Sequence, residues 1–412
     1  MISPERIRAY ALKNALEHDG KAHLGSVING LFNEGLKKEK IKDILPEVRR
    51  IVGEVNTLER DKQTKLFAGL AESIGYREER HGLPDLDHVS KRGVRMRFAP
   101  SPSGPLHIGH ALTASPSYLY VKKYGGTLFI RIEDTNPENI YLPAYTMIAE
   151  EAHWLFGNKI KVLIQSSRMK SYYALIEELL KKQAVYVCTC SPESFKENVM
   201  QKKACPCRTL SLKENKSRWK KMLSKKGYSD GEAVVRFKSS MTYKNPAFRD
   251  FPLARINSTP HPLQKNKYRV WPLMNLAVTA DDIDTNITHI IRGKDHRDNA
   301  EKQKMIFAVM KKKYPQSYFL GRIHLKDMEL SSTQTRKDIE EGKYSGWDDT
   351  RLFTIASLRK QGYKPVAFHK LAEQIGLSEV DKTIDKKELM RLLDTFNSVD
   401  SAVKSSLHKK HL

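Results

Sequence analysis

Apolar residues recur every three or four positions through the first 90 residues of the chain. This spacing predicts amphipathic helices, each with one buried and one solvated face. The positions that carry the pattern are Ile7, Leu12, Ala15 and Leu16, followed by Ile41, Ile44, Val48, Ile51 and Val52. Gly82, Pro84 and Asp85 then predict a loop. We therefore expect a helical region of its own over residues 1–90.

From residue 91 the pattern alternates between short apolar runs and longer segments with helical spacing. The short runs predict strands at 94–98, 127–133, 160–165 and 288–292. The longer segments predict helices at 106–123, 145–156, 172–182 and 299–312. Strands that alternate with helices are typical of a parallel sheet covered by helices. The predicted fold class is therefore α/β, of the doubly wound type.

The alternation stops at residues 186–269, which contain all four cysteines, many basic residues and several prolines. We interpret this stretch as an insertion into the α/β domain, whose two halves span residues 91–185 and 270–325. Residues 326–412 look helical and basic.

The charge of the chain favours a polyanionic partner. Lys and Arg number 72 and Asp and Glu 48, which gives a formal net charge of +24. Each phosphate that such a protein neutralises releases condensed counterions, so nucleic acid is the favoured partner. No basic helix with a wide apolar face is evident, which disfavours a membrane surface. The plain alternative is a charged surface that keeps the protein soluble.

The chain lacks the features of secreted and membrane proteins. Its N-terminus has no apolar run of a signal peptide. It also lacks an apolar stretch of the roughly 18 residues that a transmembrane helix needs. We therefore expect a cytoplasmic protein whose cysteines are reduced and available as metal ligands.

The most informative motif runs from Arg97 to His110 and reads Arg-Phe-Ala-Pro-Ser-Pro-Ser-Gly-Pro-Leu-His-Ile-Gly-His. It joins a predicted strand to a predicted helix, on which His107 and His110 share one face. Free N–H groups at a helix N-terminus attract phosphates, and imidazoles beside them can donate hydrogen bonds to a reacting phosphorus centre. Gly109 leaves room for a flat group near the backbone. Structural histidines and a metal site are the alternatives, but no third ligand is evident.

This segment resembles the nucleotide-binding motif of class I aminoacyl-tRNA synthetases. Other stretches resemble the glutamyl branch of archaeal type: Arg131-Ile-Glu-Asp-Thr135, Val187-Cys-Thr-Cys190, Gly231-Glu-Ala-Val-Val-Arg236, Ile291-Arg-Gly-Lys-Asp-His296 and Tyr344-Ser-Gly-Trp-Asp-Asp349. The resemblance extends from about Ile7 to Leu389. It implies a Rossmann-like catalytic domain, an inserted acceptor-binding domain, an N-terminal helical extension and a C-terminal helical region that contacts the tRNA stem.

The resemblance implies a glutamate–tRNA ligase that works in two steps. ATP, with Mg²⁺ shielding its phosphates, activates L-glutamate as glutamyl adenylate, and the glutamyl group then moves to the 3′ terminal adenosine of tRNA. Because a guanidinium fork suits a carboxylate, Arg97 and Arg292 are expected on the glutamate side chain. The glutaminyl branch lacks the second arginine, which favours glutamate over glutamine.

The remaining site residues also follow from the resemblance. Glu133 is implied on the α-amino group, with Ser101 beside it, and Met274 stands where the family usually has a tyrosine that touches the amino acid. ATP contacts are implied for Pro100, Gly104, His107, Gly109, His110, Ser331 and Ser332. Catalytic roles are implied for His107, His110, Arg336 and Lys337.

The four cysteines occur as two Cys-x-Cys pairs, Cys188 with Cys190 and Cys205 with Cys207. Four thiolates can close a tetrahedral structural Zn²⁺ site, although this spacing is tighter than usual. The nearby basic residues suit an RNA backbone or form a solvated face. They are Lys202, Lys203, Arg208, Lys216, Arg218, Lys220 and Lys221.

Met274 and two further departures from the family pattern leave other functions open. The second motif, residues 329–337, has Gln334 in place of a lysine, so Arg336 or Lys337 supplies the charge there. Relatives continue into β-barrels that read the anticodon, so anticodon contacts are here absent, lost by truncation or provided by a separate polypeptide. The alternative functions are glutamylation of a modified base in tRNA, and tRNA binding without catalysis.

Overall fold

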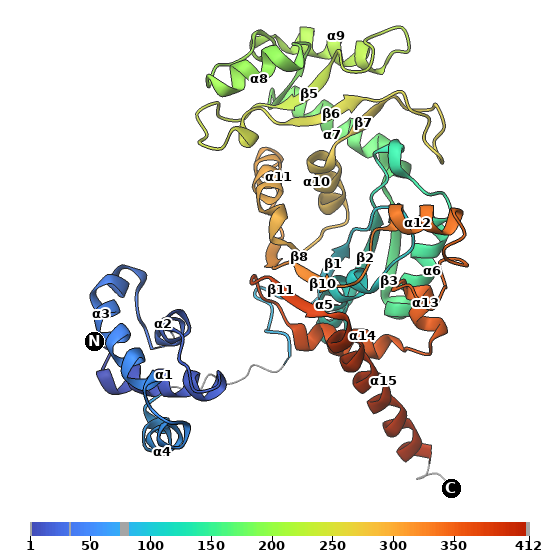
Figure 1. Ribbon diagram of the computed structural model, residues 1–412. Helices are drawn as coiled ribbons and strands as arrows, with labels where there is room; N and C mark the ends of the chain where they lie inside the picture. The colour runs from blue at the N-terminus through green and yellow to red at the C-terminus, as the bar shows by residue number, and fades with distance from the viewer. Residues whose placement is uncertain (1, 33, 75–81, 409–412) are drawn as a thin grey trace. The chain divides into compact units, whose positions relative to one another are not determined.

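The computed structural model describes residues 2–32, 34–74 and 82–408 of the 412-residue chain. The chain divides into two compact units, residues 1–80 and residues 81–412, whose elements are labelled in Figure 1. Within the described ranges, no helix is both long and apolar enough to cross a membrane.

The first unit is built of helices that bury the apolar face predicted from the sequence. Its helices are α1 (Pro4–Glu17), α2 (Leu24–Phe32), α3 (Ile41–Asn56) and α4 (Arg60–Leu70). Ser3 caps α1 by accepting a hydrogen bond from the N–H of Arg6, and Pro4 suits the first helical position. Leu12, Leu31 and Ile51 are fully buried at the centre of the unit.

The second unit contains the predicted parallel sheet. Strand β1 (Val94–Phe98) pairs with β2 (Gly126–Ile132), which pairs with β3 (Ile160–Ile164), all in parallel. Strand β8 (His289–Gly293) pairs in parallel with β9 (Gln316–Leu320). The N–H of Thr288, just before β8, donates to the carbonyl of Arg95 at 2.9 Å. This bond joins β8 to β1 and confirms the doubly wound arrangement.

Helices precede or follow these strands along the chain. Four correspond to predicted helices: α5 (Ile108–Tyr124), α6 (Ala144–Phe156), α7 (Met169–Lys181) and α11 (Arg297–Val309). The helix α10 (Met274–Asp284) was not predicted. Leu112, Val121, Ile148 and Leu155 pack against Met96 and Ile130 in the main core.

The interrupted stretch, extended to residues 185–272, forms an antiparallel sheet of its own, drawn at the top of Figure 1. Its strands follow the order β4 (Val185–Cys188), β5 (Val234–Phe237), β6 (Pro252–Ile256) and β7 (Val270–Pro272). Helices α8 (Pro192–Met200) and α9 (Leu212–Leu223) belong to the same stretch. Val187, Leu253 and Trp271 share a core with residues of α7, α10 and α11, so the insertion is packed onto the helices that flank the site.

The last part of the unit is more mixed than predicted. It contains the helices α12 (Ser332–Glu340), α13 (Ile355–Lys360), α14 (Pro365–Ile375) and α15 (Lys386–His408). It also contains β10 (Ile323–Lys326) and β11 (Lys382–Asp385), which pair in parallel. The expectation of a helical region was therefore incomplete. The two strands were missed because each is only four residues long and its apolar residues alternate with polar ones. Phe368 and Leu371 of α14 are fully buried in the main core, and α14 packs against α5.

Candidate active site

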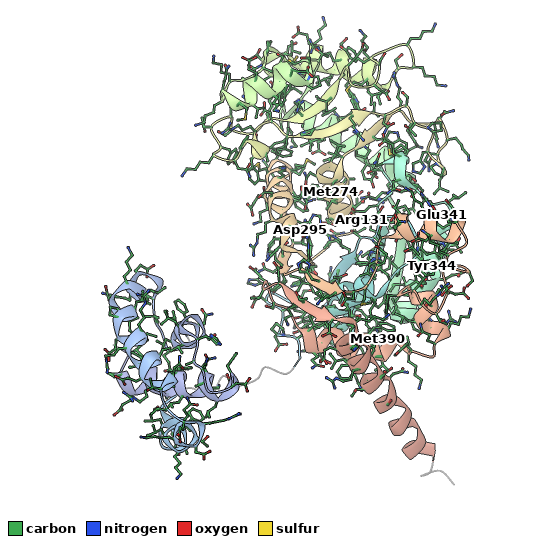
Figure 2. The ribbon with its side chains drawn as sticks, in the orientation of Figure 1. Arg131, Met274, Asp295, Glu341, Tyr344 and Met390 are labelled. Carbon is green, nitrogen blue, oxygen red and sulfur yellow. The ribbon has the colours of Figure 1, made fainter. Side chains whose placement is uncertain are left out.

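One cavity brings together half of the substrate-binding and catalytic residues that the sequence singled out. It has a volume of about 430 Å³ and lies beside the ends of β1, β2 and β8. In Figure 2, Arg131, Met274 and Asp295, which line it, appear in the middle of the second unit. The predicted residues that line the cavity are Arg97, His107, Gly109, His110, Glu133, Met274 and Arg292. The two arginines therefore share one space with the two histidines.

The histidine pair is organised by the start of helix α5. His107 is the N-cap, with an extended backbone, so the helix begins at Ile108 and the prediction that both histidines lie within the helix was wrong. The N–H of His107 donates to Nδ1 of His110 at 3.3 Å, and the N–H of His110 donates to Nδ1 of His107 at 3.4 Å. This capping box stacks the two rings, with centroids 3.7 Å apart.

The capping box also decides where the histidine protons are. A ring nitrogen that accepts from a backbone N–H carries no proton, so in each neutral ring the proton is on Nε2. Burial lowers the pKa of His107 to about 4, and burial together with His107 lowers the pKa of His110 well below its usual value. At neutral pH the pair therefore offers two uncharged Nε2–H donors.

Two glycines in the motif are required by close packing. A Cβ on Gly109 would lie 3.0 Å from Cε1 of His107, so any side chain would displace that ring. A Cβ on Gly104 would lie 2.7 Å from Cβ of Ser332 and 3.2 Å from Trp347. Gly104 therefore lets the second motif approach the first.

Arg97 is held by a buried network of charged groups. Its Nε donates to Oδ1 of Asp282 at 3.3 Å, and Nη1 of Arg131 donates to the same oxygen at 2.5 Å. Arg131 also donates to Glu133 at 3.0 Å. Burial raises the pKa of Asp282, but Arg97 and Arg131 outweigh it, so the pKa is lowered overall. Asp282 is therefore ionised and fixes both guanidinium groups at the cavity.

Arg292 differs because its partners are neutral. Its Nη2 donates to Oε1 of Gln303 at 3.0 Å and to the hydroxyl of Tyr314 at 2.6 Å. Its Nε is buried and has no hydrogen-bond partner. Burial, and then Arg97, lower its pKa to about 10. Among the described residues no carboxylate forms an ion pair with Arg292. The site thus holds a half-buried positive charge, and its buried Nε–H is unpaired.

Other predicted residues lie outside the cavity lining. Ser101 is exposed, while the carbonyl of Pro100 accepts from the N–H of Glu133 at 2.9 Å, which ties the loop to the end of β2. Ser331 caps α12. Arg336 lies 3.9 Å from Glu340 and over the ring of Tyr141, and Lys337 is exposed. The structure does not bring Arg336 or Lys337 into the cavity.

The four cysteines converge although they come from two separate segments. Their sulfur atoms all lie within 4.8 Å of one another, and the Cys188–Cys205 and Cys190–Cys207 pairs are each 3.8 Å apart. Four sulfurs at about 2.3 Å from a Zn²⁺ ion would be about 3.8 Å apart in a regular tetrahedron. A hydrogen bond from Cys188 lowers the pKa of Cys205 to about 5. The cluster therefore fits the donor set and size of a Zn²⁺ site.

The comparisons with known proteins agree with this geometry. The family model of the class I tRNA synthetases (E and Q), catalytic domain, matches residues 93–398. The chain belongs to this family. It is 40% identical to the glutamate–tRNA ligase of Methanocaldococcus jannaschii over 378 residues, which are 92% of this chain and 68% of that protein. It is 42% identical to the glutamate–tRNA ligase of Pyrococcus furiosus over 385 residues, 91% of this chain and 67% of that protein.

Solved structures of synthetases share the fold. The glutamate–tRNA synthetase of Elizabethkingia anophelis matches with a TM-score of 0.51 and 19% identity, over 78% of this chain and 75% of that one. The glutamate–tRNA ligase of Elizabethkingia meningosepticum, solved with its amino acid, matches with a TM-score of 0.50 and 20% identity. That match covers 73% of this chain and 68% of the other.

Several residues of this synthetase's site were missed by the sequence argument. Asp282, Gln303 and Tyr314 hold the two arginines, yet none was predicted to. A signal for the first existed, because Asp281 and Asp282 are adjacent carboxylates that follow a largely apolar stretch of helix α10, and buried carboxylates need partners. No comparable signal marks Gln303 or Tyr314.

Proposed function

We propose that this synthetase attaches L-glutamate to tRNA, in the two steps of activation by ATP and transfer to the 3′ terminal adenosine. The observation that supports this most is Arg292, a half-buried guanidinium that shares a cavity with the histidine pair and has no carboxylate partner among the described residues. A substrate carboxylate would supply the missing negative charge.

The arrangement of charges explains a preference for glutamate over glutamine. The cavity lining contains four guanidinium groups, of Arg97, Arg131, Arg292 and Arg322, against two carboxylates, of Glu133 and Asp295, and Asp282 pairs with Arg97 and Arg131 from behind the lining. The excess of positive charge is balanced by a γ-carboxylate but not by a neutral amide. An amide would also leave a buried N–H facing the guanidinium, which costs about 1–3 kcal/mol. Glu133, which is partly exposed to the cavity, would accept from the α-amino group.

The histidine pair serves the phosphate end of the reaction. The two Nε2–H groups would donate to the oxygens of the α-phosphate while the α-carboxylate of glutamate attacks phosphorus and pyrophosphate leaves. Neutral donors that are already fixed by the capping box need little reorganisation as charge develops. Mg²⁺ would accompany ATP and shield its phosphates. Ser331, Ser332, Arg336 and Lys337 are proposed to meet the nucleotide only if the second motif moves toward it.

The cysteine cluster is proposed as a structural Zn²⁺ site. Cys188, Cys190, Cys205 and Cys207 would hold the ion, which would tie the end of β4 to the loop before α9. In bound form the ion would contribute folding energy to the antiparallel sheet. The basic residues around it, among them Lys216 and Lys220 on α9, are proposed to meet the acceptor end of tRNA.

The test is an aminoacylation assay in which the acceptor position is part of the readout. The purified chain receives ATP, labelled glutamate and total tRNA, and half of the tRNA is first oxidised with periodate, which destroys the 3′ terminal diol. Label that is lost in mild alkali and absent from oxidised tRNA supports the proposal. Label that persists on oxidised tRNA indicates glutamylation of a base, and tRNA binding without label indicates a non-catalytic protein. Labelled glutamine in parallel measures amino-acid choice.

A further inference from the structure

Behind the histidine pair lies a buried carboxyl group that the proposed reaction does not use. Glu151 is on α6 and is 9% exposed. It lines a second cavity, of about 540 Å³, whose other charged residues are Glu150, Asp348, Arg359 and Lys360. Asp348 and Lys360 pair with each other at 2.7 Å, so neither neutralises Glu151.

Glu151 is instead bound by the backbone of two other segments. The N–H of Leu106, the residue before His107, donates to its Oε2 at 2.6 Å. The N–H of Ala356, in the first turn of α13, faces the same carboxyl group, and both residues line this cavity. These amides come from parts of the chain about 250 residues apart, so a single side chain joins both to α6.

The two segments also pair with each other. The N–H of Ile355 donates to the carbonyl of Leu106, and the N–H of Ile108 donates to the carbonyl of Phe353, both at 2.9 Å. His107 forms an isolated antiparallel bridge with Thr354. The backbone that carries His107 is therefore held in a short ladder with residues 353–355, and Glu151 accepts from Leu106 in that ladder and faces Ala356 directly after it.

We propose that Glu151 is a positioning residue, which fixes the backbone of His107 by bracing Leu106 and Ala356 against α6. The histidine rings are aligned by N–H groups of residues 107 and 110, so a shift of this backbone moves both Nε2–H donors. Displacements of about 1 Å in a positioned group can lower a rate by about 100-fold. The kinetic part of this inference rests on the proposed ligase function, whereas the bracing itself does not.

Three variants of the full chain separate positioning from general stability. Glu151→Ala removes both acceptors. Glu151→Gln keeps one, because its amide oxygen still accepts from Leu106. Burial raises the pKa of Glu151 to about 8, so the uncharged glutamine is also a fair match to the wild-type group at pH 7. Glu150→Gln is the control, since Glu150 lines the same cavity but is exposed.

The measurements are pyrophosphate exchange in the presence of tRNA, and hydrogen exchange of the backbone N–H groups of Leu106 and Ala356. Glu151→Ala should lower kcat at least tenfold and leave the KM for glutamate within twofold, because Arg97 and Arg292 are held by other partners. Its Leu106 and Ala356 amides should exchange at least tenfold faster. Glu151→Gln should recover kcat to within threefold of wild type, and Glu150→Gln should match wild type.

The inference is overturned if Glu151→Ala keeps wild-type kcat, or if the alanine and glutamine variants lose kcat equally. It is also overturned if exchange speeds up as much in β1 and α10 as at Leu106, since Glu151 would then only stabilise the fold. If the wild-type chain gives no pyrophosphate exchange, the ligase function fails. In that case, an equal rate of hydrogen exchange at the Leu106 N–H in wild type and Glu151→Ala would also refute the claim that Glu151 braces this backbone.

Discussion

Replacing Arg292 by glutamine should weaken function and strengthen the fold at the same time. The guanidinium is half-buried near Arg97, and in the free protein its hydrogen bonds go to the neutral groups of Gln303 and Tyr314. In the folded protein its charge is therefore a net cost, which Asp282 offsets in part and the substrate carboxylate would offset further.

The size of both effects can be worked out from the structure. Truncating one partner of a buried charge pair costs about 2–5 kcal/mol, so kcat/KM for glutamate should fall by about 100-fold or more. The pKa of Arg292 is lowered to about 10, which corresponds to about 3 kcal/mol against the charged folded form. At pH 7, below the folded-state pKa of about 10, Arg292 is charged in the folded protein, so the full penalty on the free energy of unfolding is present. The loss of two hydrogen bonds costs about 2 kcal/mol, so the free energy of unfolding should rise by about 1 kcal/mol in all.

The assay combines pyrophosphate exchange at varied glutamate with urea unfolding at pH 7, for wild type, Arg292→Gln and Arg60→Gln. Arg60 is an exposed arginine in the first unit, so its variant should change neither quantity. A kcat/KM for Arg292→Gln within threefold of wild type would refute the role given to Arg292. A loss of stability of 2 kcal/mol or more would show that its charge is already compensated in the free protein.

Three further predictions concern the charged network, the histidine pair and the cysteines. Asp282→Asn should lower the free energy of unfolding by about 3 kcal/mol, because it breaks a buried pairing, whereas Asp284→Asn on the same helix should cost less than about 1 kcal/mol; equal losses in urea unfolding would contradict the network. Because burial lowers the folded pKa of His107 to about 4, stability should be complete above pH 6.5 and fall by up to about 3 kcal/mol as the pH drops from 6.5 toward 4. In His107→Asn, which keeps an N-cap, the free energy of unfolding should fall less over that pH range than in wild type, as measured by urea unfolding. An equal fall in both proteins would count against this role of His107. The chain should contain roughly one Zn²⁺, and a chelator or Cys207→Ser should lower the Tm by several degrees; metal-free protein with an unchanged Tm would exclude the ion.

The sequence predicted the parts of the fold that are set by local patterns. The strand at Val94–Phe98 was predicted with its observed bounds, because its apolar run is short and flanked by polar and proline-rich segments. The helix after it begins at Ile108, two positions later than expected, since His107 adopts an extended backbone to cap it. The strands at 323–326 and 382–385 were missed because each is stabilised by the other, across nearly sixty residues of chain.

The residues of the site also divide into those that the sequence could predict and those that it could not. Motif residues such as Arg97, His107 and Arg292 could be predicted to meet, because the ends of neighbouring parallel strands lie at one edge of a sheet. Their supporting partners could not, since the Arg97–Asp282 contact joins residues 185 positions apart and the Leu106–Glu151 contact joins residues 45 apart. No spacing rule connects positions that meet only through the tertiary fold.

The most direct test is a crystal structure of the chain with a non-hydrolysable glutamyl-adenylate analogue. The account predicts that the γ-carboxylate lies within hydrogen-bond distance of the guanidinium of Arg292, and that the group replacing the α-phosphate lies beside Nε2 of His107 or His110. An analogue whose side chain points away from Arg292, or which binds outside this cavity, would contradict it.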